Sequence, residues 1–140
     1  MKVIRLEGKS SKYQTISLQD ICSVLAQNNY GADCSWSIDW FEAVVKPSFP
    51  FSLLNFENKI NKDKNPHITG FAELQSIANS IEDAVNVIVK SYCGSNYQSD
   101  SENNERAVDL RIELFDSTYW EIEARDSQII RSLEMSFAAQ

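Results

Sequence analysis

Apolar and polar residues alternate most regularly in the last third of the chain. Apolar side chains occupy every second position over 108–114 and again over 120–124, with polar or aromatic residues between them. A period of two is typical of strands with one buried face, and Asp116-Ser117-Thr118 between the runs favours a turn. The pattern predicts a β-hairpin. A helix capped by Asp126 or Ser127 is expected next, with a buried side of Ile129, Ile130, Leu133 and Phe137.

The composition of the two hairpin strands strongly favours one pairing register. If Phe115 lies opposite Tyr119, apolar residues meet apolar residues along one face, and opposite charges pair on the other. A shift of one residue would place apolar side chains opposite polar ones. The favoured register also sets Glu113 opposite Glu121, and like charges placed so cost roughly 0.2–1 kcal/mol. A partner that supplied Lys or Arg would remove that cost.

Four other segments have the composition or alternation of strands. Lys2–Leu6 is a short β-like run, Tyr13–Ile16 is a candidate for a second, and His67–Thr69 is a candidate edge segment. Cys34–Val45 begins with strict alternation of apolar and polar residues, which predicts a half-buried strand. The doublet Trp40-Phe41 breaks the alternation, so we expect either a bulge there or burial on both faces.

Helical spacing of apolar residues appears in three earlier segments. Ser17 and Asp20 have the spacing of a capping box, which predicts a helix over 18–27. Apolar residues recur every three to four positions over 71–79 and over 81–92, which predicts two more helices. Together the elements predict an α+β fold: a mostly antiparallel sheet of about four to five strands, helices packed on one face, and a C-terminal β-hairpin followed by a helix.

The remaining segments are expected to connect these elements within a single domain, 1–140. Phe49–Phe56 predicts a packed connection leading into a short helix, and 59–66 predicts a polar loop. Ser95–Arg106 is rich in Ser, Asn, Asp and Glu without an apolar period, which predicts a mobile loop. No linker is long enough to split the chain, and 140 residues suit one domain.

Composition and charge narrow the function classes. Hydrophobic residues make up 43% and charged residues 24%, which excludes a wholly disordered chain. With 13 Lys and Arg against 20 Asp and Glu, the net charge of −7 argues against binding to nucleic acid or to an anionic membrane. No apolar run approaches the ~20 residues of a membrane span, and the N-terminus lacks the apolar stretch of a signal peptide. We therefore expect a cytoplasmic protein.

The residues that carry reactive chemistry predict neither catalysis nor metal binding. Cys22, Cys34 and Cys93 are odd in number and far apart, so three reduced, partly buried thiols are expected. His67 is the single histidine and falls in a polar segment, where a surface or strand-start role is expected. Without a nucleophile–base pair, a zinc-ligand spacing or a Gly-rich phosphate loop, we expect no enzyme, no cofactor and no metal.

The outer face of the predicted hairpin is the candidate partner-binding surface. It would present acidic side chains framed by two aromatic residues: Asp109, Glu113, Phe115, Tyr119, Glu121 and Glu123. One interpretation is a docking surface for a basic partner, with the aromatic residues as anchors. The other is a solvated sheet face whose salt bridges contribute little individually.

Two other groups of residues admit a functional interpretation. Trp36, Trp40 and Trp120 could line a ligand pocket, although such residues more often belong to the core. Asp39 and Glu42 would point to opposite faces of a strand, which argues against a shared acidic site. A small-ligand-binding or enzymatic domain with a Trp-lined pocket is thus an alternative function, and a scaffold or adaptor in a larger assembly is a third.

Two segments resemble a known group of proteins. Trp36–Val44 and Asp109–Ile122, with the helical middle and the closing helix, are similar to small bacterial immunity proteins of polymorphic or contact-dependent toxin systems. The resemblance implies a cytosolic, non-enzymatic inhibitor that binds one cognate toxin domain, and it carries over no contact residue because such families diverge at the binding face. Many such toxins are nucleases, whose basic clefts would attract an acidic inhibitor, so a basic toxin domain is the expected partner.

Overall fold

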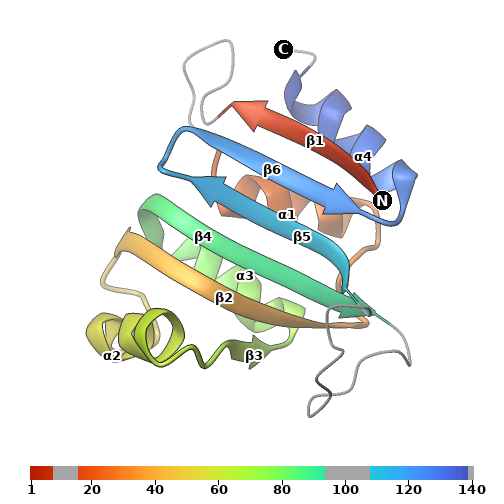
Figure 1. The fold of residues 1–140 in the computed structure, drawn as a ribbon. Helices are drawn as coiled ribbons and strands as arrows, with labels where there is room; N and C mark the ends of the chain where they lie inside the picture. Colours follow the sequence, from red (N-terminus) through yellow and green to blue (C-terminus); the bar gives the residue numbers. More distant parts are fainter. Residues whose placement is uncertain (8–15, 94–107, 139–140) are drawn as a thin grey trace.

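The computed structural model describes residues 1–7, 16–93 and 108–138 (Figure 1). Six strands form one antiparallel sheet in the order β1–β6–β5–β4–β2–β3. The strands are β1 (Lys2–Glu7), β2 (Cys34–Val45), β3 (His67–Thr69), β4 (Ile81–Cys93), β5 (Val108–Phe115) and β6 (Tyr119–Ala124). The helices are α1 (Leu18–Gln27), α2 (Leu53–Glu57) with its π-helical continuation η1 (Asn58–Lys62), α3 (Phe71–Asn79), and α4 (Ser127–Leu133) with its continuation η4 (Glu134–Ala138). The predicted α+β class is confirmed, with more strands than expected.

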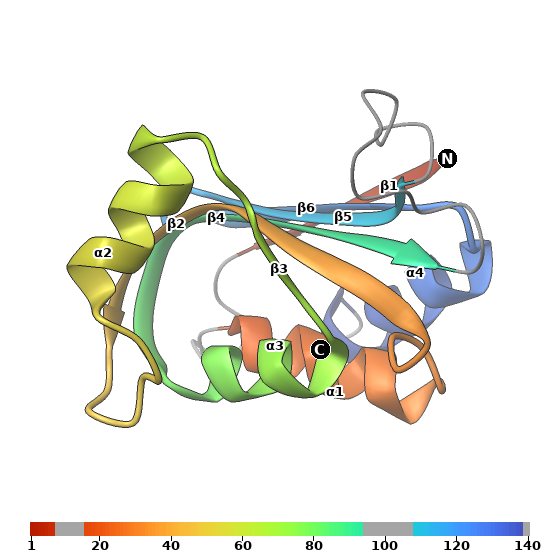
Figure 2. The ribbon, with the colours of Figure 1, turned by 90° about the horizontal axis from the view of Figure 1, so that it is seen from below.

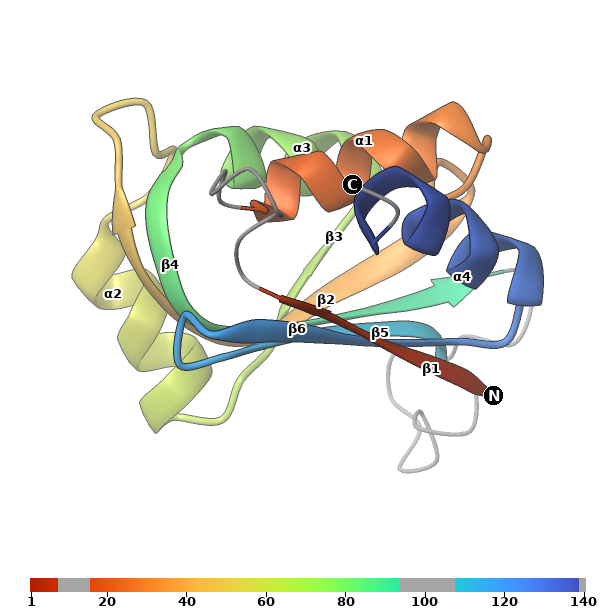
Figure 3. The same cartoon turned by 90° about the horizontal axis from the view of Figure 1, so that it is seen from above.

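Three helices share one side of the sheet. Viewed along the sheet, α1, α3 and α4 lie together on the same side, while α2 lies at the edge beside β2 (Figure 2, Figure 3). Figure 1 looks onto the opposite side, which none of these three helices covers. We call this side the open face. The sheet therefore has one face that builds the core and one that α1, α3 and α4 leave uncovered.

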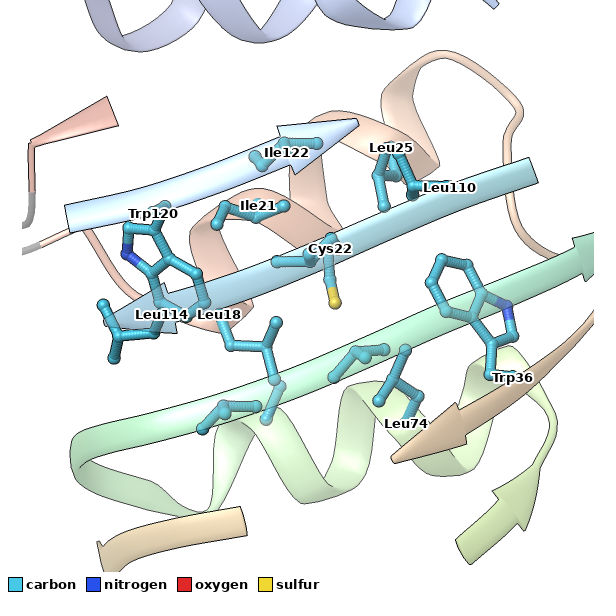
Figure 4. Close-up of a cluster of buried hydrophobic side chains, with 14 of the residues drawn as sticks. Leu18, Ile21, Cys22, Leu25, Trp36, Leu74, Leu110, Leu114, Trp120 and Ile122 are labelled. Carbon is cyan, nitrogen blue, oxygen red and sulfur yellow. The ribbon is translucent and has the colours of Figure 1, made fainter. Parts of the chain in front are cut away.

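The core fills the space between the sheet and the three helices (Figure 4). Trp36 and Trp120 are 0% and 1% exposed, and their indole N–H groups donate to the carbonyls of Gly31 and Ile16, each at 3.0 Å. Burial of a Leu or Ile side chain contributes about 1.5–3 kcal/mol. The cluster around the two indoles includes Leu18, Ile21, Cys22, Leu25, Leu74, Leu110, Leu114 and Ile122.

The predicted β-hairpin is confirmed together with its register. Phe115 pairs with Tyr119 and Leu114 with Trp120, and the alignment continues to the end of β6. Asp116 and Ser117 adopt left-handed conformations, with φ of 50° and 59°, which reverse the chain within a short turn. The apolar residues of both strands are buried at alternate positions, as a sheet with one covered face requires.

The helix predicted over 81–92 is wrong, because this segment forms β4. β4 lies between β2 and β5, and both of its edges are hydrogen-bonded. Val87 and Val89 point into the core, while Ile88 between them is half-buried on the open face. A strand with apolar residues on both faces loses the strict alternation that identifies a strand with one buried face. Its apolar positions then match a helical spacing by coincidence.

The segment that was predicted as a polar loop, 59–66, is partly helical and completes the edge of β2. Ile60 in η1 is 1% exposed, which anchors this turn in the core. The amide of Asn61 accepts from the Phe41 N–H at 2.9 Å and donates to the Phe41 carbonyl at 2.7 Å, as a neighbouring strand would. The short helix predicted before it is confirmed as α2. Of the two alternatives for Trp40-Phe41, a bulge is found, and it lies at Asp39, immediately before the doublet, where the register shifts between Ile38 and Trp40.

The other predicted elements are confirmed where the structure describes them. The side chains and backbone N–H groups of Ser17 and Asp20 bond reciprocally at 3.0 and 2.9 Å, so the capping box of α1 is present. The strands predicted at residues 2–6 and 67–69 and the helices predicted at residues 71–79 and after Asp126 are also found. Tyr13–Thr15 of one predicted strand and the predicted loop Ser95–Arg106 lie outside the described residues.

The expectation of three reduced thiols is wrong. Cys34 and Cys93 stand opposite each other in the β2–β4 pair, with Cα atoms 4.2 Å apart, and form a disulfide. The helical spacing of 81–92 concealed the strand pairing that brings these two residues together. Cys22 is a buried free cysteine, and burial raises the pKa of its thiol to about 12. The thiol of Cys22 therefore stays protonated at neutral pH and is not a nucleophile.

Candidate functional site

Alternate side chains of each strand point to the open face. The pairing register aligns them into rows that cross the sheet, so neighbours in a row come from different parts of the chain. We call one of these the central row; it runs from β1 to β2 through Arg5, Glu121, Glu113, Ile88 and Trp40. On one side of the central row lies a second row, Glu123, Arg111 and Lys90. On its other side lies a third row, Tyr119, Phe115 and Asn86. The open face is thus a surface of mixed charge with aromatic residues.

The structure places most of the predicted surface residues together. Glu113, Phe115, Tyr119, Glu121 and Glu123 are half-buried residues on the open face. Asp109 follows the same alternation in β5 and already has two partners: its Oδ2 accepts from the backbone N–H of Cys93 at 2.6 Å, and its Oδ1 lies 3.6 Å from Nε of Arg125, the opposite charge that the predicted register gives it. The bond to Cys93 lies at a register shift between Ser91 and Tyr92, which the pattern of β5 alone does not reveal.

Cations of the same chain lie beside the paired glutamates. Glu113 and Glu121 stand opposite each other, as predicted. Arg111 donates a hydrogen bond to Glu113, and Arg5 occupies the position opposite Glu121 in β1. These neighbours offset the predicted repulsion within the chain itself. The sequence could not show the place of Arg5, because β1 and β6 belong to opposite ends of the chain.

Aromatic rings form two groups on the open face. The rings of Phe115 and Tyr119 stack with centroids 4.8 Å apart, and the Arg5 guanidinium lies 3.5 Å from the Tyr119 centroid. Towards β2, the indole N–H of Trp40 donates to Oε1 of Glu42 at 2.6 Å. Stacking and cation–π contacts each contribute about 0.5–1.5 kcal/mol and hold the rings in place before any partner binds.

A hollow of about 290 Å³ lies on this face, lined by Met1, Lys90, Val108, Arg111 and Glu123. Its two cationic side chains have partners within the chain: Nζ of Lys90 lies 3.0 Å from Oδ2 of Asp39, and Arg111 binds Glu113. The mixed lining suits a polar or charged side chain of a partner better than an apolar one. Pockets of this kind commonly receive the anchoring residue of a protein interface.

The three tryptophans do not share a pocket. Trp36 and Trp120 are fully buried on the helix side of the sheet, whereas Trp40 is half-buried on the open face. The polar groups considered with them also have separate surroundings, since Asp39 pairs with Lys90 while His67 lies near Glu73. The geometry that the Trp-lined ligand pocket requires is therefore not formed by these residues.

Three further findings concern membrane-spanning helices, metal sites and similarity to known proteins. No helix within residues 1–7, 16–93 and 108–138 is long and apolar enough to cross a membrane. In the same residues no group of three or more His, Cys, Asp or Glu side chains could hold a metal ion. Comparison of the chain with protein-family models, curated proteins and solved structures gives no match. The resemblance to immunity proteins therefore stays a prediction.

Proposed function

We propose that this chain is a non-enzymatic immunity protein, which binds a bacterial toxin domain through its open face and neutralises it. The observation that carries the proposal is a sheet face without cover from α1, α3 or α4, on which half-buried carboxylates lie beside a stacked pair of rings. Aromatic residues held in fixed positions on such a surface are typical anchors of protein interfaces. The two segments that carry the resemblance, Trp36–Val44 and Asp109–Ile122, both contribute side chains to this face.

The charge of the molecule favours a basic partner, and a nuclease is the first candidate. The net charge of the chain is −7, and on the open face Glu113, Glu121 and Glu123 lie beside the cations Arg5, Arg111 and Lys90. A nuclease presents cations that contact phosphates, so an acidic inhibitor is attracted to its cleft and associates rapidly. An arginine of the partner placed between Glu113 and Glu121 would form charge-assisted hydrogen bonds with both.

Coexpression with the toxin domain of the neighbouring reading frame tests the proposal. We expect growth arrest by the toxin alone, restored growth when this chain is present, and a stoichiometric complex on gel filtration. Turnover of a substrate by this chain, or failure both to protect and to form a complex, would contradict the proposed function.

Charge-neutralising variants test the face itself. Glu113→Gln with Glu121→Gln keeps side-chain size and removes two charges from the central row. Glu82→Gln with Asp83→Asn removes the same charge from exposed positions at the start of β4 and is the matched control. We expect the first pair to slow association by about tenfold at low salt and the control to change it less than about twofold. Equal effects of the two pairs would exclude the open face as the binding site.

The compartment is a separate part of the proposal. A cytosolic location fits a toxin that acts in the cytosol, but a stable disulfide is typical of oxidising compartments. Acid quenching of the cells, followed by denaturation in an alkylating reagent without reductant and by mass spectrometry, distinguishes the two. Alkylation of Cys22, Cys34 and Cys93 would support the cytosol. Alkylation of Cys22 alone would place the protein in an oxidising compartment.

A further inference from the structure

A second pocket, of about 290 Å³, opens at the edge of the sheet between α2, η1 and β3. Its walls are aromatic. The rings of Phe51 and Phe56 stack with centroids 5.1 Å apart and planes 6° from parallel, and the His67 ring packs against them at 5.2 and 5.1 Å. Phe56 is buried and forms the back of the pocket, while Phe51 remains 38% exposed. The pocket therefore offers an apolar, ring-lined surface to a ligand.

A lysine that forms no ion pair with a described carboxylate lies on the wall of this pocket, and Glu73 attracts it only from beyond ion-pair distance. Nζ of Lys59 is 3.4 Å from Nδ1 of His67, and Nε2 of His67 is 3.2 Å from Oε1 of Glu73. With Nε2–H donating to Glu73, Nδ1 accepts from the lysine, and two of the three ammonium protons stay available. No carboxylate among the described residues forms an ion pair with Lys59. A half-buried cation of this kind attracts an anionic group.

The rim supplies one more hydrogen-bond donor. Asn55 and Ser52 complete the lining, and the side-chain amide of Asn55 has no bonding partner among the described residues. A carboxylate beside Lys59 could accept from this amide as well. Apolar walls with a few convergent polar groups are typical of small-molecule sites, and the volume lies at the lower end of their range.

We propose that this pocket binds a small free carboxylic acid with an aromatic or branched apolar body. The body packs against the rings of Phe51 and His67 at the mouth of the pocket, and the carboxylate pairs with the ammonium of Lys59. The ligand makes no covalent bond, and the site is independent of the open face. Because the pocket is small and open to solvent, we expect a dissociation constant of about 0.1–1 mM.

Titration of 3-phenylpropionate into the intact protein, followed by NMR, tests the proposal. We expect saturable shifts of the ring protons of Phe51 and His67. The uncharged analogue 3-phenylpropanamide should bind about ten- to a hundredfold more weakly, because it lacks the charge-assisted contact. Acetate, which has the charge without the apolar body, should cause no saturable shift. Equal binding of acid and amide, or no saturation with the acid up to about ten times the expected dissociation constant, would overturn the proposal.

A pair of lysine variants separates the site from general charge effects. Lys59→Met keeps the aliphatic stem and removes the ammonium, and we expect it to weaken binding of the acid by about ten- to a hundredfold. Lys62→Met, an exposed position in the same turn, is the matched control and should leave binding unchanged. Circular dichroism verifies that both variants are folded. Undiminished binding to a folded Lys59→Met variant would contradict the proposed role of the ammonium.

A peptide C-terminus carries the same chemical group, so a further titration identifies the source of the ligand. N-acetyl-Gly-Gly-Phe presents a phenylalanine side chain beside a free carboxylate. Binding of this peptide no tighter than that of 3-phenylpropionate supports a small acid as the ligand. Binding about tenfold tighter or more would replace the small acid by a peptide end and overturn the assignment made above.

Discussion

The two faces of the β5–β6 hairpin have the same backbone but different physical roles. On the helix side, Ile112 and Ile122 pair at 0% exposure in a layer of apolar side chains. One residue closer to the turn on each strand, Glu113 pairs with Glu121 on the open face, beside cations from β1 and β5. On the first face, removal of apolar surface from water stabilises the fold. On the second face, ion pairs replace contacts with water of similar strength and add little to stability. We infer that the helix side determines stability and the open face determines recognition.

Truncation in the core should have the largest effect. Ile112→Ala removes a fully buried side chain and leaves a cavity, so we expect the free energy of unfolding to fall by about 2–5 kcal/mol. Glu113→Gln, at the neighbouring position on the open face, is the control and should change it by less than about 1 kcal/mol. Urea denaturation of both variants measures the difference. Similar losses for the two variants would remove the distinction between the faces.

The disulfide should contribute the next largest effect, at the end of the sheet where β2 and β4 pair. Cys34 and Cys93 are 59 residues apart, and closing a loop of that length restricts the unfolded chain. Replacing both residues by Ser should lower the free energy of unfolding by about 2–4 kcal/mol. Dithiothreitol should destabilise the natural chain by a similar amount and leave the double variant unchanged. Insensitivity of the natural chain to the reductant would show that this bond contributes no stability.

The contrast between the faces also explains how much of the fold could be predicted. In β5 and β6, one face is buried and the other is polar, so alternation alone defined the strands, their register and five of the surface residues. In β4, Ile88 is half-buried on the open face between buried Val87 and Val89, and the apolar run matched a helix instead. Local pattern is informative where the two faces of an element differ in polarity.

The parts of the candidate site that escaped prediction depend on pairing between distant segments. Arg5 reaches the central row only because β1 pairs with β6, and Lys90 reaches the open face only because 81–93 is a strand. Asp109 accepts from the Cys93 N–H at a register shift against β4. Each of these placements is set by strand order, which hydrophobic periodicity does not contain. The outer face of the hairpin, which was predicted to be acidic, is therefore part of a face of mixed charge.

A smaller, pH-dependent effect is expected at the sheet edge, where α3 meets β3. The hydroxyl of Thr69 donates to Oε2 of Glu73 at 2.5 Å and, with His67 nearby, lowers the pKa of this carboxyl below its ordinary value of 4.5. A depressed pKa in the folded state means that the charged carboxylate stabilises the fold above pH 4.5. This contribution is lost as the pH falls through the folded-state pKa.

Glu73→Gln isolates that contribution. We expect the variant to be less stable than the natural chain at pH 7 and the difference to shrink as the pH falls below 4.5. Glu82→Gln, which removes a charge from an exposed position, is the control and should show a smaller change. Thermal unfolding across this pH range provides the measurement. A constant difference between Glu73→Gln and the natural chain at every pH would rule out the depressed pKa as its cause.

The smallest effect is expected from a single ion pair of the open face. Oδ2 of Asp39 lies 3.0 Å from Nζ of Lys90, and both side chains are about one-fifth exposed, at 20% and 18%. A double-mutant cycle with Asp39→Asn and Lys90→Met should give a coupling energy of about 0.2–1 kcal/mol that decreases in high salt. A coupling as large as the cost of Ile112→Ala would mean that the open face stabilises the fold as the core does. Such a result would oppose its role as a recognition surface, because side chains that hold the fold together cannot vary freely to match a partner.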